Sequence, residues 1–385
     1  MGRLAAVVGI GQTKYQTQRA DVSIAGLVRE AAVRALKDAD LSWDDIDAVV
    51  IGKAPDMFEG VVMPELYLTD ALGCNGKPML RVHTAGSVGG STAIVAASHV
   101  QSGMFDRVLT VCFEKQSESN AMWALSSALP YSVHLNAGAG GHFAPVIREY
   151  IRRSKAAEYV GRMVAVKDRQ NASRNPLAHL QMPDIDMKTV EESPMLWEPL
   201  RFLESCPSSD GACAMVISNE KLANKSPNKP VWIRGTAMRS EPTMYAGRDE
   251  VNPQASRDCV KDVYAQAGIN NPRKDLDMAE IYVPFSWYEP MWLESLGVAE
   301  QDEGWKMTES GATAMDGDFP VNCSGGVLSS NAIGASGMIR FAEAARQVRG
   351  TADAHQVAGA KTALGHAFGG GAQFFAMWIV SSEKP

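Results

Sequence analysis

The first half of the chain alternates strand-like apolar runs with longer stretches of helical spacing. The runs at 4–8, 44–52 and 107–112 predict buried strands, and the stretches over 22–41 and 90–102 predict helices. Strands that alternate with helices in this way form βαβ units and a parallel sheet. The pattern therefore predicts an α/β protein.

The same order of elements returns in the second half. Strand patterns lie at 231–235, 278–283, 357–364 and 373–381, and helical patterns lie at 254–267 and 334–349. No sequence repeat is visible, so the inference of a duplicated architecture rests on this pattern alone. We predict a layered α/β/α/β/α fold made of two similar halves, residues 1–225 and 226–385, each with a mixed five-stranded sheet.

One long segment, from about 115 to 205, interrupts this order. It has helical patterns over 143–155 and 156–171, separated by polar stretches that contain prolines. Long insertions inside a compact domain usually carry function. We therefore interpret the segment as an excursion that covers the catalytic face of the first half.

Composition narrows the class of protein. With 45% hydrophobic and 21% charged residues, the chain can bury a core, which excludes wholesale disorder. Its net charge of −7 argues against a general affinity for nucleic acid or acidic membranes. No apolar run reaches the roughly 18 residues of a membrane-spanning helix, and the N-terminus lacks a convincing signal sequence. Six scattered cysteines without a CxxC pair argue against disulfides or zinc, so we expect a soluble protein of the reducing cytoplasm.

Four segments of the chain carry a family resemblance. Residues 208–214 read SSDGACA, 325–337 read GGVLSSNAIGASG, 369–372 read GGGA, and 166–176 read VKDRQNASRNP. In this order and spacing they resemble the thiolase superfamily, in particular its sterol-carrier-protein-type branch. The resemblance covers nearly the whole chain and implies a thiolase-like layered fold.

The catalytic set of a thiolase is absent from these motifs. A thiolase needs a cysteine at the N-terminus of its buried central helix, where the helix dipole lowers the thiol pKa. This chain has Ser87 at or beside that position, and a serine needs an adjacent base to act as a nucleophile. Asn331 stands in place of the histidine of the GHP motif, and 364–368 has no cysteine. We therefore expect no acyl-cysteine intermediate, and we expect thiol alkylation to leave turnover largely intact.

A retro-aldol reaction needs no covalent nucleophile. It needs a base for the proton of a β-hydroxyl group and donors that hold the departing enolate. Tyr282, within 279–285, stands where the branch has a catalytic histidine. The chain in this respect resembles the thiolase-like steroid side-chain aldolases, which also lack the nucleophilic cysteine. Their second active-site tyrosine has no counterpart here, which leaves His366 or His83 as the second acid–base group.

The proposed catalytic residues also have ordinary structural explanations. Tyr282 and His366 fit packed core residues, although their places in the motifs favour catalysis. His83, at the end of an apolar run, fits the core and the site about equally. Asn331 can satisfy a turn, and we favour binding of an oxyanion.

The candidates for substrate binding are Ser87, Tyr288, Gly369 and Gly370. Ser87 is expected to cap the central helix, or its turn to offer a backbone amide to the oxyanion. Tyr288, beside Trp287, fits a hydrophobic wall better than a catalyst. Gly369 and Gly370 belong to the C-terminal glycine cluster of the resemblance.

Three functions compete on these observations: a lyase that cleaves a β-hydroxyacyl-CoA, on a steroid side chain by the resemblance; a degradative acyltransferase; and a non-catalytic acyl-CoA-binding subunit. The missing cysteine argues against the second, and Tyr282, His366 and the glycine cluster argue against the third. We expect no cofactor besides the acyl-CoA substrate. The resemblance further implies a homodimer, with the strand at 107–114 in its interface, and a small OB-fold and zinc-ribbon partner that would carry any zinc.

Overall fold

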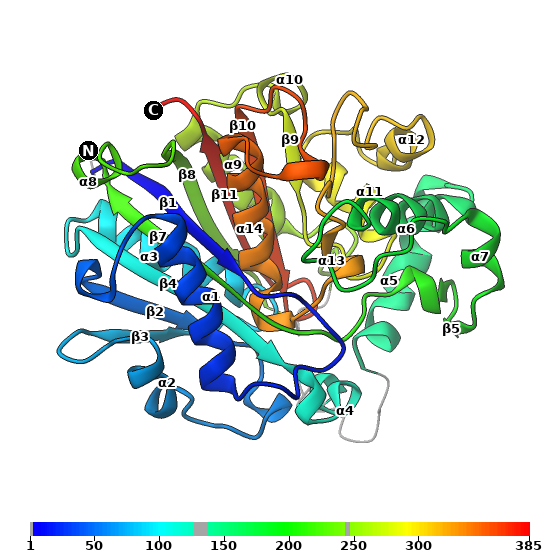
Figure 1. Cartoon of the computed structure of the whole chain (residues 1–385). Helices are drawn as coiled ribbons and strands as arrows, with labels where there is room; N and C mark the ends of the chain where they lie inside the picture. Colours follow the sequence, from blue (N-terminus) through cyan, green and yellow to red (C-terminus); the bar gives the residue numbers. More distant parts are fainter. Residues whose placement is uncertain (1–2, 127–137, 243–246) are drawn as a thin grey trace.

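A computed structural model describes residues 3–126, 138–242 and 247–385 of the chain, and Figure 1 shows its architecture. Its main sheet has nine strands in the order β3-β2-β4-β7-β1-β8-β11-β10-β9. The first five belong to the first half of the sequence and the last four to the second half. Their bounds are β1 Ala5–Gln12, β2 Ala48–Gly52, β3 Met79–Val82, β4 Arg107–Lys115, β7 Asp210–Asn219, β8 Val231–Ser240, β9 Met278–Glu280, β10 Thr362–Gly369 and β11 Phe374–Ser381.

The two halves of the sheet have the same strand directions. In the first half, β1 is antiparallel to β7, β7 is antiparallel to β4, and β4, β2 and β3 run parallel. In the second half, β8 is antiparallel to β11, β11 is antiparallel to β10, and β10 is parallel to β9. A single parallel bridge between Ala279 and Val321 occupies the place that β3 has in the first half. The predicted duplication is confirmed, although the second half has four strands rather than five.

The expectation of two separate sheets is wrong in one respect. Strands β1 and β8, the first strand of each half, pair through Ala6 with Trp232 and Val7 with Val231. Only their adjoining ends pair, so the two half-sheets meet at one corner and diverge from there. The division at 225/226 lies between α8 (Glu220–Ala223) and β8, and as a domain boundary it stays a prediction.

Two helices that bury glycine, alanine and serine residues fill the space between the half-sheets. These are α3 (Val88–Gln101) and α14 (Ile333–Arg349), and most of their residues are buried. A helix that is buried on all sides belongs to the central layer of a protein. A Cβ atom on Gly89 would lie 2.4 Å from the backbone nitrogen of Met338, so the two helices touch backbone to backbone.

Amphipathic helices cover the outer faces. Helix α1 (Ile24–Asp38) buries Leu27, Ala31 and other apolar residues of one face, and it lies directly on β1. Helix α9 (Gln254–Ala267) lies on β8 in the same way. Together with the half-sheets and the central pair, these helices complete the predicted five-layered α/β/α/β/α arrangement.

The excursion between β4 and β7 is mainly helical. Figure 1 shows its helices α5, α6 and α7 at the right of the molecule, away from β2 and β3. Its elements are α4 (Ala121–Ser126), α5 (Gly138–Ser154), α6 (Tyr159–Ala172), α7 (Met187–Glu192), β5 (Met195–Trp197) and β6 (Leu200–Arg201). The remaining short helices are α2 (Glu65–Ala71), α10 (Pro272–Asp275), α11 (Tyr288–Ser295), α12 (Gly304–Glu309) and α13 (Gly326–Ser329). None of the helices described could span a membrane, since each is too short or too polar.

Two details of the strand predictions are corrected. The strand expected at 357–364 runs instead over β10, so His366 lies inside a strand rather than in a loop beside the glycine cluster. The strand at 107–114 was expected at a subunit interface, but β4 lies inside the sheet between β2 and β7. The exposed edge of the first half is β3, because strand order depends on long-range pairing that local patterns do not contain.

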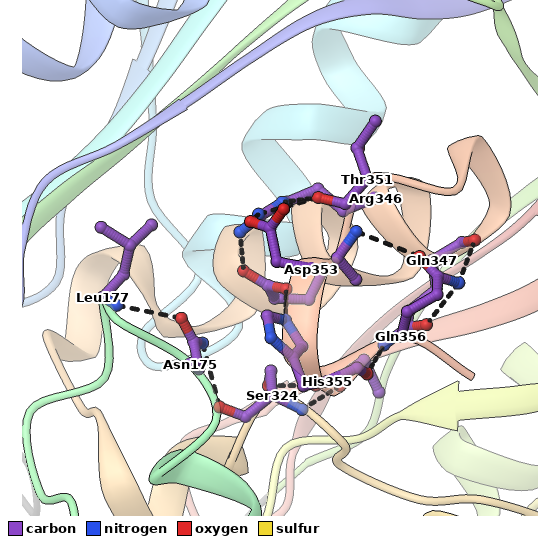
Figure 2. A network of polar contacts seen from close by, with 12 residues as sticks. Asn175, Leu177, Ser324, Arg346, Gln347, Thr351, Asp353, His355 and Gln356 are labelled. Carbon is purple, nitrogen blue, oxygen red and sulfur yellow. Dashed lines mark hydrogen bonds and ion pairs between the residues drawn. The ribbon is translucent and has the colours of Figure 1, made fainter. Parts of the chain in front are cut away.

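A buried polar network anchors the C-terminal end of α14. Glu343 accepts hydrogen bonds from Gln12 at 2.6 Å and Arg346 at 3.4 Å, and its other oxygen lies 3.0 Å from Nε2 of His355. Figure 2 shows the adjoining contacts, in which Arg346 bonds the Thr351 carbonyl at 2.9 Å and Gln347 bonds the His355 carbonyl at 2.6 Å. The network fixes the turn that leads from α14 toward β10.

Replacing Glu343 by glutamine should lower the free energy of unfolding by about 1.5–3 kcal/mol, the range for hydrogen bonds to a buried charged group. Burial raises the pKa of Glu343, but Arg346 and His355 more than offset this and hold the pKa well below its usual range. A lowered pKa gives stability above the unfolded value of about 4.3 that is lost as pH falls. Urea unfolding at pH 7 and pH 4 measures both effects. Glu300→Gln, at an exposed position, is the control, and an equal loss in both variants would contradict the prediction.

Candidate active site

Tyr282 lies where the two halves meet, two residues after the end of β9. Its side chain is only 4% exposed. A Cβ atom on Gly86, in the turn before α3, would lie 3.8 Å from the Tyr282 hydroxyl and 3.2 Å from the carbonyl oxygen of Phe368. The phenol therefore faces the N-terminus of the central helix, which is where a thiolase would carry its nucleophile.

The turn before α3 is held in an unusual conformation. Ala85 has a φ of 50°, in the left-handed region that residues other than glycine rarely adopt. A Cβ atom on Gly369 would lie 2.3 Å from the backbone nitrogen of Ser87, so the glycine cluster after β10 packs directly on this turn. Strained backbone of this kind concentrates at functional sites. Gly370, in contrast, is exposed and turns away with a φ of 65°.

Three contacts fix the Tyr282 side chain and backbone. Its backbone N–H donates to Nδ1 of His366 at 3.3 Å, and its carbonyl accepts from Nε1 of Trp292 at 2.9 Å. Its ring meets Phe368 edge-on, with centroids 5.3 Å apart. The hydroxyl of Ser336, in the first turn of α14, acts on the Tyr282 phenol and opposes the rise of its pKa.

The environment of Tyr282 keeps the phenol neutral. Burial raises the pKa of Tyr282 above its ordinary value of 10, and the hydroxyl of Ser336 and the charge of Arg340 offset only part of this. We expected His366 or Asn331 to stabilise a phenolate, but His366 bonds the Tyr282 backbone, and Asn331 bonds Ser336 and Cys206. The Tyr282 side chain is therefore a neutral phenol, and not a phenolate, near neutral pH.

A chain of hydrogen bonds continues from Ser336 to a thiol. Ser336 donates to Oδ1 of Asn331 at 2.8 Å, and Nδ2 of Asn331 donates to the sulfur of Cys206 at 3.2 Å. Ser209 holds the Asn331 backbone from both sides, at 3.1 Å and 3.0 Å. The Asn331 side chain thus lies in the site, and one of its two N–H donors meets only a weak sulfur acceptor.

Sequence reasoning missed Ser336 and Cys206. Ser336 stands five residues after Asn331 inside a motif that we interpreted through its glycines, and its helical register was the available signal. Cys206 precedes the SSDGACA segment, and its backbone N–H donates to the Pro284 carbonyl at 2.9 Å, beside the Tyr282 loop. Of the six cysteines it is the only one that is not fully buried. Burial raises the pKa of Cys206 to about 12, despite the nearby charge of Arg169.

His366 contacts Tyr282 through the Tyr282 backbone N–H, not through the hydroxyl group. Burial lowers the pKa of His366 to about 3, so the imidazole is neutral at physiological pH. Because Nδ1 accepts from Tyr282, the proton of the neutral ring is on Nε2. That Nε2 atom is buried and has no hydrogen-bond partner among the residues described. His366 therefore offers a free donor within an aromatic environment of Trp292 and Phe375.

Two predicted site residues have other surroundings. Ser87 is buried at the start of α3, but its hydroxyl donates to the Thr84 carbonyl at 2.8 Å and caps no helical N–H, so the expected capping role is wrong. His83 follows β3 and is exposed overall, although partial burial of its ring and the charge of Arg81 lower its pKa. The contacts of Tyr282 with described residues do not include His83.

Tyr288 belongs to an aromatic cluster that adjoins the site. It is fully buried, and its ring stacks on Phe368 at 5.4 Å and lies 4.9 Å from Trp292. Phe368 contacts both Tyr282 and Tyr288. The predicted hydrophobic wall is therefore present next to the proposed catalytic phenol. No group of metal-ligating side chains occurs in the part of the chain that the structure describes.

Comparison with known proteins supports the thiolase-like fold. Residues 237–382 match the family model described as thiolase C-terminal domain-like. The solved Ltp2–ChsH2(DUF35) aldolase superposes with a TM-score of 0.85 at 26% identity, over 100% of this chain and 99% of that one. The chain therefore has a thiolase-like fold, and its C-terminal part matches the thiolase family model.

The curated relatives of this chain have different activities. The acetyl-CoA acetyltransferase of Methanothermobacter thermautotrophicus is 29% identical over 96% of this chain and 97% of its own length. The 17-hydroxy-3-oxo-4-pregnene-20-carboxyl-CoA lyase of Mycobacterium tuberculosis is 28% identical over 94% and 95%. Human sterol carrier protein 2 is 27% identical over 96% of this chain and 71% of its own length, which agrees with the predicted branch.

The position of Cys206 changes the expected result of thiol alkylation. Iodoacetamide should modify Cys206 before the five buried cysteines, and slowly, because its raised pKa leaves little thiolate. The added group would then fill the space beside Asn331 and block turnover, contrary to the expectation from sequence. Peptide mass spectrometry identifies the first modified cysteine, and Cys206→Ala is the control that should stay active and resist inhibition. Earlier modification of another cysteine would contradict this account.

Proposed function

We propose that this protein is a carbon–carbon lyase that cleaves a β-hydroxyacyl-CoA by a retro-aldol reaction, on a steroid side chain. The observation that carries the proposal is a buried neutral phenol, Tyr282, at the N-terminus of α3, where the Ser87 hydroxyl bonds the Thr84 carbonyl and the helix itself begins without a cysteine. The similarity to a steroid-carboxyl-CoA lyase and to a solved aldolase supports the same reaction class.

The reaction balances without a covalent intermediate. The bond between the α- and β-carbons breaks, its electron pair passes to the thioester as an enolate, and the β-hydroxyl oxygen becomes a carbonyl. The hydroxyl proton is lost and one proton is gained at the α-carbon. In a concerted relay, Tyr282 takes the β-hydroxyl proton while it passes its own proton to the α-carbon. A neutral phenol can therefore serve both steps, and no phenolate is required.

The other residues hold the developing charge. The free Nε2–H of His366 and the Asn331 amide are the donors assigned to the enolate oxygen, because neither has a strong acceptor in the protein. The backbone around Ser87 and Gly369 lines the thioester end, and Tyr288 lines the acyl body. Gly370 was predicted to bind substrate, but its position is exposed, so the proposed mechanism assigns it only to the glycine turn. His83, exposed beside β3, has no role in this mechanism.

An acyltransferase is the second candidate, because of the acetyltransferase relative and the thiol in the site. A thiolase needs a thiolate, however, and burial raises the pKa of Cys206 to about 12. His366, the histidine that contacts Tyr282, uses Nδ1 to bind the Tyr282 backbone and cannot deprotonate the thiol through that atom. These properties rank the lyase first.

Tyr282→Phe should lower kcat for cleavage of a β-hydroxyacyl-CoA by about 10²–10⁴-fold, because the substitution removes the hydroxyl and keeps the ring against Phe368. The carbonyl product is measured after mixing enzyme and substrate. Tyr264→Phe is the matched control, since its hydroxyl bonds the Leu296 carbonyl away from the site. A Tyr282→Phe enzyme with the parental rate would refute the assignment.

A homodimer and a partner protein complete the proposal. The edge strand β3 lies beside a row of exposed apolar side chains on and before α2, joined to it where Arg81 bonds the Val62 carbonyl. These side chains are Val62, Met63, Leu66 and Tyr67, and Leu80 of β3 is exposed as well. An unpaired edge beside an apolar patch is a common protein interface, and a second copy of the chain is its proposed occupant.

The proposed second component is a small OB-fold and zinc-ribbon protein. It is supported by the solved relative, an aldolase that contains two named components, Ltp2 and ChsH2. Analytical ultracentrifugation at micromolar concentration should give a dimer, and Leu66→Glu should give a monomer. Adding a purified zinc-ribbon protein should raise the sedimentation coefficient and the turnover. A monomer with full activity alone would contradict both proposals.

A further inference from the structure

The hydroxyl group of Tyr288 is buried without a partner. Tyr288 is the first residue of α11 and has no exposed surface, and its oxygen makes no hydrogen bond to any residue that the structure describes. Buried hydroxyl groups in native proteins are nearly always bonded, so an unbonded one requires an explanation. Phenylalanine would fill the same aromatic position without this deficit.

The ring of Tyr288 belongs to the aromatic cluster that adjoins Tyr282. Phe143 meets the ring edge-on at 5.4 Å, Trp292 lies at 4.9 Å, and Phe368 stacks on it at 5.4 Å. Phe368 also contacts Tyr282. The hydrocarbon part of a bound acyl group that reaches Tyr282 would therefore lie within contact of the same rings.

Polar groups adjoin the cluster next to Phe143. His142 lies against Phe143, and its Nε2 is 3.9 Å from a carboxylate oxygen of Glu250, outside hydrogen-bond distance. The Nε2 atom is likewise buried without a partner among the described residues. The charges of Glu250 and Arg248 both act on the Tyr288 phenol, whose pKa is raised by burial and by Glu250 and lowered by Arg248. Arg248 itself bonds the carbonyl of Gly371, so this polar group is fixed to the glycine loop.

We propose that the Tyr288 hydroxyl and the His142–Glu250 pair bind an oxygen substituent, a hydroxyl or a ketone, on the body of the acyl group. The inference rests on the proposed function in taking an acyl-CoA as the ligand, and it adds the substrate class: oxygenated, largely apolar acyl groups rather than plain hydrocarbon chains. A substrate oxygen would supply the missing partners, whereas a deoxy analogue would leave them unbonded. Sites that hydrogen-bond a substrate group reject analogues that lack it.

Binding of two matched thioesters tests the proposal without turnover. Both are CoA thioesters of the same fused-ring acid without a β-hydroxyl group, and only one has a ring ketone. Calorimetry should show that the parental protein binds the ketone about tenfold more tightly. In Tyr288→Phe the preference should disappear, so that the two thioesters bind with equal affinity. An equal preference in Tyr288→Phe, or none in the parental protein, would overturn the proposal.

Thermal unfolding provides the second measurement. Tyr288→Phe removes a hydroxyl without a partner and should keep or raise the Tm, whereas the control Tyr264→Phe removes a bonded hydroxyl and should lower it. An equal loss in both variants would mean that Tyr288 is bonded within the protein and would refute the inference. If the thioesters bind as expected but no β-hydroxyacyl-CoA is cleaved, the lyase proposal fails and this inference stands.

Discussion

The contact between α3 and α14 determines where every residue of the candidate site lies. The two helices touch through glycine, since a Cβ atom on Gly337 would lie 2.8 Å from the backbone nitrogen of Gly90 and 2.8 Å from the Ala367 side chain. This approach brings the first turn of α14, with Ser336, to the turn before α3. Tyr282 and the glycine cluster then occupy the space between the helix ends. A larger residue at either glycine would separate the halves and the site together.

Burial sets the chemical state of the site more strongly than residue type does. It raises the pKa of Tyr282 and Cys206 and lowers the pKa of His366, so a phenol, a thiol and an imidazole are all neutral near pH 7. A site without an ionised nucleophile or a charged base is poorly suited to acyl transfer through a thiolate. It is suited to a coupled proton transfer with fixed hydrogen-bond donors, which is the requirement of a retro-aldol cleavage.

Local patterns in the sequence predicted the repeated β/α order, the central helices and the position of Tyr282, because each depends on short-range spacing or on a motif. They did not predict that β3 rather than β4 is the exposed edge, or that β1 joins β8, because pairing is a long-range property. The same limit applies within the site. His366 was expected to support the Tyr282 hydroxyl, but β10 begins and ends five residues later than predicted, and the ring meets the backbone instead. Cys206 lies near Asn331 through a contact between distant segments that no single motif contains.

The central claim is that cleavage proceeds without an acyl-enzyme, and intact-protein mass spectrometry tests it most directly. The purified chain is mixed with a β-hydroxyacyl-CoA, quenched in acid during turnover, and weighed, with a simple acyl-CoA as the parallel sample. The account predicts an unmodified protein mass in both samples and a free carbonyl product in the first. A mass increase equal to the acyl group, located on Cys206 or Ser87, would contradict the account and assign the chain to the acyltransferases.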